Sequence, residues 1–341
     1  MLNTVYRLVE PRRIEAEFCD IDVNGDDIIV RPTHLAICNA DQRYFQGIRP
    51  PEVLRQKLPM ALIHEGIGRV VHDPKKEFSA GTCVVMVPNT PVEDDPVVAE
   101  NYRRSSRFRS SGYDGFMQDV VSMRRDRVIA LPEGIDRNVA AFTELVSVSQ
   151  HTIDRFMAKA HERRDVIGVW GDGNVAFITS LLLKKRLPES KVYIFGKHDY
   201  KMNDFIFADD VYHIDNIPEG MTIDHGFECV GRSGISASIN QMIDCIRPEG
   251  CIATMGVSED NVPINTRMVL EKGLTIFGSS RSGAEDFRSL LALYREKPEI
   301  VDYLARIVRD VIEVHTIEDM IMSFDTDIQK RGGKTIMVWK K

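Results

Sequence analysis

The chain has 341 residues, with 44 Lys and Arg against 51 Asp and Glu, and a formal net charge of −7. That length allows two domains, each with a sizeable core. The negative balance argues against general nucleic-acid binding, which requires a basic surface. No apolar run approaches the roughly 18 residues of a membrane-spanning helix, so no membrane span is expected.

The cysteines and the N-terminal sequence favour a cytoplasmic protein. The segment MLNTVYRLVEPRR lacks the basic-then-apolar plan of a secretory signal. The six cysteines are scattered, without CxxC pairs or regular spacing, at Cys19, Cys38, Cys83, Cys229, Cys245 and Cys251. This pattern is typical of reduced thiols rather than of a disulfide framework.

The first part of the chain, up to about Arg127, is rich in short strand signals. The segments DDIIVRPTHLAIC, GIGRVVHD and GTCVVMVPN are β-branched runs interrupted by Gly, Pro and Asp. They indicate a compact, mostly-β lobe. The next segment, RNVAAFTELVSVSQHTIDRFMAKAHERR (137–164), contains no Gly or Pro and has the apolar spacing of one long helix.

Strand and helix signals then alternate. Strands are predicted in DVIGVWG, KVYIFG, DVYHI, IDHGFECVG, GCIATMGV and LTIFGSS, and helices in NVAFITSLLLKKRL, KMNDFIFAD and GISASINQMIDCI. Such alternation predicts a parallel sheet covered on both faces. The end of the chain predicts two helical stretches, in EDFRSLLALYREKPEIVDYLARIV, and a last strand in GKTIMVWKK.

A glycine-rich segment, VWGDGNVAFITSLLL, follows one predicted strand and opens a predicted helix. Gly171, Gly173 and Ala176 give the pattern G-x-G-x-x-A. The glycines permit a tight turn and close backbone approach, and the helix N-terminus at Asn174 and Val175 turns N–H groups toward a pyrophosphate. The pattern alone also fits an ordinary strand-to-helix turn, but its place between two strands and a helix favours dinucleotide binding.

The end of the next predicted strand indicates which dinucleotide is bound. Gly196 lies about 25 positions after the first glycine, near the usual place of the ribose-binding carboxylate of NAD-specific proteins. Here Gly196 leaves room, while Lys197, His198 and Lys201 supply positive charge and hydrogen-bond donors for a 2′-phosphate. We therefore expect NADP(H), the alternative being a solvated basic turn.

Potential metal ligands lie in the β-rich lobe. Cys38, His64 and Glu144 offer S, N and O ligands for Zn²⁺, with a fourth position left for water or substrate. Glu65 is a further ligand or a neighbouring charge, and Asp41 is placed to orient His64 through its other ring nitrogen. Taken singly, each residue has an ordinary explanation, as a core cysteine, a satisfied polar histidine or a first-turn acid.

In this order, and over nearly the whole chain, these pieces resemble the medium-chain, zinc-dependent dehydrogenase/reductase family. CNAD, IHE and TEL match the places at which that family holds its catalytic zinc, which implies Cys38, His64, Glu65 and Glu144 as metal and catalytic residues. The resemblance implies an α/β protein with three segments: a GroES-like β-rich catalytic domain (1–145), a doubly wound Rossmann NADP-binding domain (146–285), and a return to the catalytic domain (286–341). The second, four-cysteine zinc site of many members is not expected, because EDDPVVAENYRRSSRFRSSGYDG has no cysteine.

Longer strings narrow the resemblance. LPMALIHEG, VVMVPNTP, RSSGYDGFMQD, WGDGN, FECVG, INQMID and GSSRSG resemble the ribulose-5-phosphate reductases (ribitol-5-phosphate dehydrogenases) of wall teichoic acid synthesis. This resemblance implies NADPH-dependent reduction of the C2 ketone of D-ribulose 5-phosphate to D-ribitol 5-phosphate, with zinc polarising the ketone. It also implies a cytoplasmic enzyme, a homo-oligomer, and association with the cytidylyltransferase that makes CDP-ribitol.

A phosphorylated substrate requires cations near the metal. The segment YRRSSRFRSSG offers Arg103, Arg104, Arg107 and Arg109, and Arg43 follows the zinc cysteine closely. Because the planar guanidinium binds two phosphate oxygens, we expect Arg43, Arg104 and Arg107 to bind the substrate phosphate. A solvated loop or a subunit contact is the alternative for the arginine cluster.

The proton route stays open. Many family members carry Ser or Thr two residues after the zinc cysteine, but this chain has Ala40. The candidates are water at the metal, Glu65, the substrate hydroxyls and Tyr44. By analogy with the family, GSSRSG passes near the nicotinamide, with Arg281 available to a phosphate.

Three other activities remain as alternatives. A zinc polyol dehydrogenase acting on a free sugar alcohol with NADP⁺ would need no phosphate-binding cations. A non-catalytic NADPH-binding scaffold subunit would be expected to have lost the metal ligands. A zinc-free quinone-reductase-like protein is likewise disfavoured by the intact Cys38, His64 and Glu144.

Overall fold

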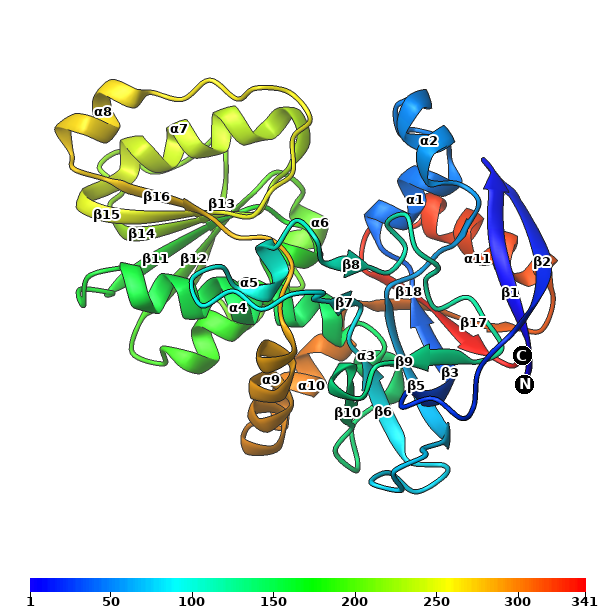
Figure 1. Cartoon of the computed structure of the whole chain (residues 1–341). Coiled ribbons are helices and arrows are strands. Elements are labelled where there is room, and N and C mark those ends of the chain that lie inside the picture. The colour runs from blue at the N-terminus through cyan, green and yellow to red at the C-terminus, as the bar shows by residue number, and fades with distance from the viewer. The chain divides into compact units, whose positions relative to one another are not determined.

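The structure is a computed structural model that describes residues 1–341. The chain forms two compact units, of which unit 1 comprises Met1–Ser147 and Ser282–Lys341 and unit 2 comprises Val148–Arg281. The two are treated separately below, and their elements are labelled in Figure 1.

Unit 1 is built on a seven-stranded mixed sheet in the order β10-β6-β5-β3-β18-β17, with β9 paired to β3. Its strands are β3 (Ile28–Ala36), β5 (Glu65–His72), β6 (Cys83–Met86), β9 (Val121–Met123), β10 (Val128–Ala130), β17 (Val308–Val314) and β18 (Lys334–Trp339). A second sheet has the order β2-β1-β4, and β7 pairs with β8. The strands of these two smaller sheets are β1 (Leu2–Glu10), β2 (Arg13–Asp20), β4 (Met60–Ala61), β7 (Asn89–Thr90) and β8 (Arg107–Phe108).

The register of the large sheet brings distant parts of the sequence together. Ala36, the last residue of β3, is paired with Glu65 of β5 on one side and with Ile336 of β18 on the other. The start of β5, the start of β18 and the residues just after β3 therefore meet at one end of the sheet. This junction contains the predicted metal ligands Cys38 and Glu65 and, from the end of the chain, Lys334.

Unit 1 also contains helices of 4 to 13 residues. They are α1 (Asn39–Phe45), α2 (Pro51–Lys57), α3 (Arg137–Ala140), α9 (Ala284–Glu296), α10 (Glu299–Ala305) and α11 (Ile317–Gln329), with 3-10 turns η1 (Glu100–Tyr102) and η2 (Arg125–Arg127). Helix α11 begins at a capping box in which Thr316 and Asp319 satisfy each other's backbone N–H groups. It packs against α1, where the rings of Phe45 and Phe324 stack with centroids 4.5 Å apart.

Unit 2 contains a six-stranded, all-parallel sheet in the order β13-β12-β11-β14-β15-β16. The strands are β11 (Val166–Trp170), β12 (Lys191–Gly196), β13 (Asp210–His213), β14 (Ile223–Glu228), β15 (Ile246–Thr254) and β16 (Thr275–Gly278). Counted from β11 this is the order 3-2-1-4-5-6 of the doubly wound dinucleotide-binding fold, which confirms the predicted fold class.

Helices cover both faces of this sheet. They are α4 (Thr143–Lys159, which begins in unit 1), α5 (Asn174–Arg186), α6 (Asp199–Met202), α7 (Ile235–Cys245) and α8 (Thr266–Glu271), with the 3-10 turn η3 (Arg232–Gly234). Figure 1 shows α4 and α5 on one face and α7 with α8 on the other. Phe156 of α4 packs edge-on against Phe227 of β14, whereas on the other face Met242 of α7 lies over Gly226.

Some predicted element bounds are wrong. The long helix predicted at 137–164 is divided into α3 and α4, and the Thr143 hydroxyl at the break donates to the carbonyl of Ala140, which competes with helix bonding. Of the helix predicted in KMNDFIFAD (201–209), only Lys201 and Met202 are helical, at the end of α6. Beyond it Phe205 and Phe207 both pack edge-on against Phe177, and a spacing of two residues does not suit one helix face.

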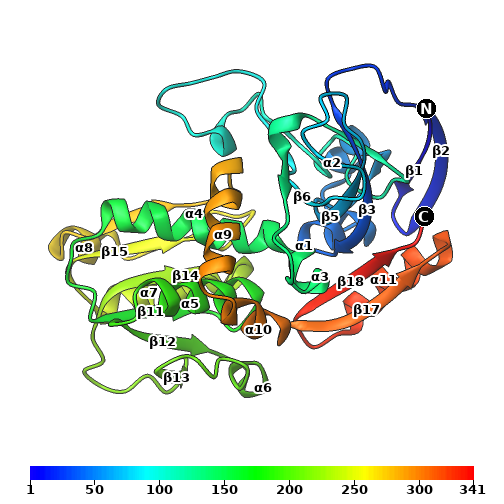
Figure 2. The same cartoon turned by 90° about the horizontal axis from the view of Figure 1, so that it is seen from below.

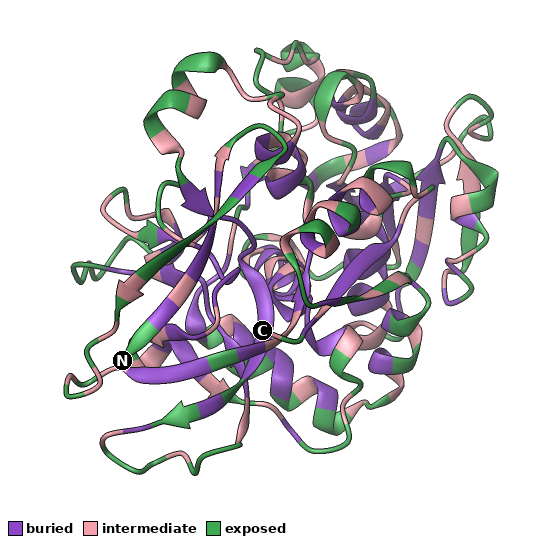
Figure 3. Ribbon diagram, turned by 90° about the vertical axis from the view of Figure 1, so that its right-hand side faces the viewer, coloured by how far each residue is buried: buried purple, intermediate pink, exposed green.

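The C-terminal region contains two elements that the sequence analysis missed, β17 and α11, which come between the two predicted helices and the last strand. Figure 3 shows buried residues along the strands and exposed residues mainly in loops and on outer helix faces. No helix in the chain combines the length and the apolar character needed to cross a membrane.

Candidate functional site

The predicted metal ligands are gathered in unit 1. Cys38 Sγ lies 3.6 Å from His64 Nε2, and His64 Nε2 lies 4.0 Å from Glu144 Oε2. Ligand atoms of Cys38, His64 and Glu65 all lie within 4.8 Å of one another. Sulfur and nitrogen ligands of one tetrahedral zinc are about 3.5 Å apart, given Zn–S near 2.3 Å and Zn–N near 2.0 Å. The arrangement therefore fits a zinc ion, although which residues bind it stays a prediction.

Asp41 organises the backbone around this group. Cys38 caps the N-terminus of α1, where its sulfur accepts from the Asp41 N–H and its thiol donates to Asp41 Oδ2 at 2.9 Å. Asp41 Oδ1 accepts from the N–H of Ile63 at 3.0 Å and from the hydroxyl of Ser110 at 2.7 Å. Ile63 precedes His64 and has φ of 70°, a rare conformation for a β-branched residue. Asp41 thus holds a strained turn in place.

The predicted hydrogen bond between Asp41 and His64 is not formed. His64 Nδ1 is 3.9 Å from Asp41 Oδ1, and this buried nitrogen has no hydrogen-bond partner. The reason is that Oδ1 is already occupied by Ile63 and Ser110. The His64 ring instead packs edge-on against Phe108, with centroids 5.1 Å apart.

The electrostatics of the group call for a cation. Burial raises the pKa of the Cys38 thiol, with further contributions from the negative charges of Asp41 and Glu65. Burial also raises the pKa of Glu65, against the opposing effect of Lys334. For Glu144, burial, reinforced by Glu65 and opposed by His64, raises the pKa to about 7. Asp41, Glu65 and Glu144 are buried close to one another, and a divalent ion would offset the repulsion between their charges.

Lys334 is a component that the sequence analysis did not identify. Its ammonium lies 2.7 Å from Glu65 Oε2 and donates to the carbonyl of Ile37 at 2.8 Å. Although burial would lower it, the negative charge of Glu65 raises the pKa of Lys334 above its usual value. The available signal was a lysine at the start of a strongly apolar closing strand.

In unit 2, the glycine loop has the shape that a pyrophosphate requires. Gly171 has φ of 131°, and a Cβ there would lie 3.0 Å from the carbonyl oxygen of Cys229. A Cβ on Gly173 would meet nothing within 4 Å, so the loop leaves open space at that point. Gly173 caps α5 without a side chain, and the first-turn N–H groups, including that of Val175, point out of the helix end. These features fit the diphosphate of a dinucleotide.

The predicted 2′-phosphate residues lie together at the end of β12, with two details that the sequence did not show. A Cβ on Gly196 would lie 2.5 Å from the Met202 sulfur, so the missing side chain leaves space for Met202. The turn after Gly196 is also bound to a carboxylate, because Asp172 accepts from the N–H groups of Lys197 and His198.

The arginines of the predicted phosphate cluster have different environments. Arg103 donates to the carbonyls of Val98 and Asp95, and Arg109 donates to the carbonyls of Asp114 and Ser122, so both support loops. Arg104 and Arg107 are exposed. The Arg107 guanidinium lies 5.6 Å from the ring centroid of Tyr113, and its neighbour Phe108 packs on His64. Arg43 lies on α1, which Cys38 caps.

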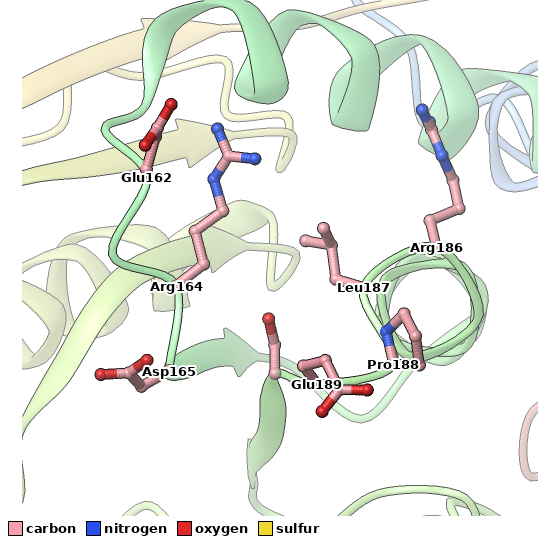
Figure 4. A pocket seen from close by; sticks show the side chains of 8 residues that line it. Glu162, Arg164, Asp165, Arg186, Leu187, Pro188 and Glu189 are labelled. Carbon is pink, nitrogen blue, oxygen red and sulfur yellow. The ribbon is translucent and has the colours of Figure 1, made fainter.

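A cavity of about 310 Å³ in unit 2 is not the cofactor site. Figure 4 shows it between the loop that precedes β11 and the end of α5, lined by residues that include Glu162, Arg164 and Arg186. It lies at the amino ends of β11 and β12, whereas dinucleotides bind at the carboxyl ends. Arg164 donates to the last carbonyls of α4, and Arg186 pairs with Asp154 at 2.7 Å.

Comparisons with known proteins give the family of the chain. Residues 24–133 match the model of the alcohol dehydrogenase GroES-like domain, and residues 194–296 match that of the zinc-binding dehydrogenase. The chain is 54% identical to ribulose-5-phosphate reductase 1 of Staphylococcus aureus over 99% of both chains, and 54% identical to ribulose-5-phosphate reductase of Bacillus spizizenii over 100% of both. The crystal structure of S. aureus TarJ in complex with NADPH superposes with a TM-score of 0.91, at 50% identity over 100% of both chains.

Proposed function

The chain belongs to the zinc-binding dehydrogenases, in the group of ribulose-5-phosphate reductases, and we infer from this that it reduces D-ribulose 5-phosphate to D-ribitol 5-phosphate with NADPH. The observation that carries the inference is the 54% identity over 99% of the chain. The site adds chemical support, because Cys38, His64 and Glu144, the ligands expected of a zinc reductase, lie close together with Glu65 beside them.

We propose that Cys38, His64 and Glu144 hold the zinc, with Glu65 beside them as a further ligand or a neighbouring charge. When bound, zinc supplies a Lewis acid for the ketone oxygen and NADPH supplies the hydride. Lys334 balances the charge of Glu65 and fixes its carboxylate. Because Ala40 carries no hydroxyl, the proton that completes the alcohol must come from another group.

Tyr44 is one candidate for that proton. Its hydroxyl is largely buried on α1, two turns from the cap at Cys38. Burial raises the pKa of Tyr44, while the positive charge of Arg49 and a hydrogen bond with Ser111 oppose the rise. A neutral phenol is therefore available at neutral pH. Glu65 and the hydroxyls of the substrate are the other candidates.

For the cofactor, we propose that Gly171, Gly173, Asn174 and Val175 bind the diphosphate. Gly196, Lys197, His198 and Lys201 form the turn at which the 2′-phosphate binds. For the substrate phosphate we propose Arg43, Arg104 and Arg107, of which Arg107 is tied to the metal group through Phe108 and His64.

We further propose a biological setting. The product, a polyol phosphate, suits a nucleotidyltransferase as the next enzyme, so association with a ribitol-5-phosphate cytidylyltransferase in wall teichoic acid synthesis is expected. The protein would act in the cytoplasm as a homo-oligomer. Co-purification of the cytidylyltransferase with the tagged chain would test the association directly.

The main competing function is a zinc polyol dehydrogenase for a non-phosphorylated sugar alcohol, and a non-catalytic scaffold is a second. The assembled metal group argues against the scaffold. The deciding experiment compares D-ribulose 5-phosphate with D-ribulose as substrates of the zinc-loaded protein, and identifies the product by mass spectrometry. We expect D-ribitol 5-phosphate from the first and at most slow turnover of the second. Equal rates with both would favour the free-polyol activity, and no turnover of either would favour the scaffold.

A further inference from the structure

Asp172, between the two glycines of the loop in unit 2, reaches across to the neighbouring strand. Strands β11 and β12 are parallel with Trp170 paired to Phe195, so the loops that follow them leave the sheet at the same edge. Asp172 Oδ2 accepts from the N–H of Lys197 at 2.9 Å, from the N–H of His198 at 2.9 Å and from His198 Nδ1 at 2.8 Å. One carboxylate oxygen therefore fixes the turn that follows β12.

This carboxylate is ionised and mostly buried, and its Oδ2 atom already accepts three hydrogen bonds. The side chain is only 12% exposed, and Lys201 Nζ lies 3.6 Å from Oδ1. Burial alone would raise the pKa of Asp172, but hydrogen bonds from Lys197 and His198 lower it. An ionised carboxylate offers about four acceptor positions. Because the side chain is mostly buried and Oδ1 faces the Lys201 ammonium, the carboxylate offers little surface to ribose hydroxyls, which the carboxylate of NAD-specific sites binds.

The same turn is held from its other side. His213, the last residue of β13, donates through Nε2 to the carbonyl of Lys197 at 2.9 Å, and its Nδ1 accepts from the N–H of Asp215. Figure 2 shows β12, β13 and α6 together at this edge of the sheet. His198, bound to Asp172 through Nδ1, keeps 45% of its side chain exposed, so Nε2 remains for another partner.

We propose that Asp172 is a positioning residue that makes the protein prefer NADPH to NADH. It holds Lys197, His198 and Lys201 in the geometry that binds the 2′-phosphate, and its own carboxylate is withheld from the ribose hydroxyls that NADH presents. The inference rests on the proposed binding of NADPH at this loop. The inference also predicts the direction in which the affinity for NADPH changes when the Asp172 carboxylate is removed. A carboxylate acting only as a negative charge would repel the 2′-phosphate, so its removal would strengthen NADPH binding, whereas loss of a positioning group weakens it.

The test uses two probes that differ only in the 2′-phosphate, 2′,5′-ADP and 5′-AMP, titrated calorimetrically into the full-length, zinc-loaded protein. Wild type should bind 2′,5′-ADP more tightly. Asp172→Ala should weaken 2′,5′-ADP by about 10-fold or more while 5′-AMP stays within about 2-fold, the size expected for lost charge-assisted hydrogen bonds. The matched control is Asp199→Ala, which removes an exposed carboxylate from α6 and should keep the preference.

A double-mutant cycle with His198→Ala separates positioning from general damage. If Asp172 acts through the turn, His198→Ala should cost less 2′,5′-ADP affinity in the Asp172→Ala background than in wild type. Asp172→Asn, which keeps one acceptor oxygen, should lie between wild type and Asp172→Ala and serves in its place if Asp172→Ala does not fold. Equal weakening of both probes, unchanged preference or tighter 2′,5′-ADP binding would overturn the inference. If wild type itself shows no preference, the NADPH proposal fails instead.

Discussion

Lys334 Nζ lies 2.7 Å from Glu65 Oε2, and the two side chains are only 2% and 1% exposed. The pair joins the closing strand β18 to the strand that follows His64, across more than two hundred residues of sequence. A second contact, from Lys334 to the carbonyl of Ile37, ties the same ammonium to the residue before Cys38. Strand β18 therefore contributes a charged side chain beside the predicted metal ligands, in addition to completing the sheet.

Replacement of Lys334 by methionine should destabilise the metal-free protein by about 3–5 kcal/mol, because Glu65 is left as an unpaired buried charge. Zinc should reduce that loss, since the ion supplies the missing positive charge. Denaturant titrations with and without zinc measure both effects. The control is Lys340→Met, whose partner Glu313 is exposed and whose loss should hardly change stability. Equal destabilisation by the two variants would contradict the role given to Lys334.

Replacement of each acidic candidate by its amide should distinguish the zinc ligands. Glu144→Gln should weaken zinc binding by more than about 100-fold, beyond the 10–100-fold typical of residues that only support a ligand, whereas Glu65→Gln should stay within that range. Chelator competition gives the affinities without reference to turnover. A larger loss in Glu65→Gln than in Glu144→Gln would exchange the two assignments.

Alanine at the two loop glycines should affect different properties of the protein, its stability at Gly171 and its NADPH affinity at Gly173. Gly171→Ala should destabilise unit 2 by about 1–3 kcal/mol, because alanine is strained at φ of 131° and its Cβ would lie 3.0 Å from the carbonyl oxygen of Cys229. Gly173→Ala should cost no more than about 1 kcal/mol yet weaken NADPH binding, since its Cβ projects into the open space of the loop. Thermal unfolding and NADPH fluorescence titration separate these outcomes. Unchanged NADPH affinity in Gly173→Ala would place the cofactor elsewhere.

His225 should make unit 2 less stable in acid. Burial, with the neighbouring charge of His161, lowers the pKa of His225 to about 4, against about 6.5 in the unfolded chain. Between these values the unfolded state binds the extra proton, so stability is full above pH 6.5 and falls as the pH drops toward 4. The loss amounts to about 3 kcal/mol.

The chain has two tryptophans, one in each unit, which makes this pH effect measurable. In a Trp339→Phe background, Trp170 alone reports the unfolding of unit 2 by urea. His225→Asn keeps an acceptor for the Cys251 N–H and should flatten the pH dependence between 6.5 and 4. A slope as steep as that of the parent protein would show that other groups control it.

The parts of the site that the sequence predicted are those carried by short local patterns. The glycine loop and the Cys38, His64 and Glu144 set lie in strings whose chemistry is readable without the fold. Lys334 and Asp172 were missed because their roles depend on register. Lys334 reaches Glu65 only because Ile336 and Glu65 both pair with Ala36. Asp172 meets His198 only because β11 and β12 are adjacent.

Two further details of the site depend on tertiary neighbours that the sequence does not show. Asp41 seemed suited to orient His64, but its Oδ1 binds Ile63 and Ser110 instead. At Gly196, the sequence did not show that the space of the missing side chain lies beside Met202. Neither outcome follows from residue type or spacing, because each depends on which neighbours the folded chain places beside the atom.

The most direct test of the account is NADPH oxidation with D-ribulose 5-phosphate, followed by nicotinamide absorbance, in protein that is zinc-loaded, stripped by a chelator, and then reloaded. The account predicts fast turnover in the loaded protein, loss of turnover on stripping, recovery on reloading, and little activity when NADH replaces NADPH. Turnover that survives complete removal of zinc, or no turnover in the loaded protein, would contradict it.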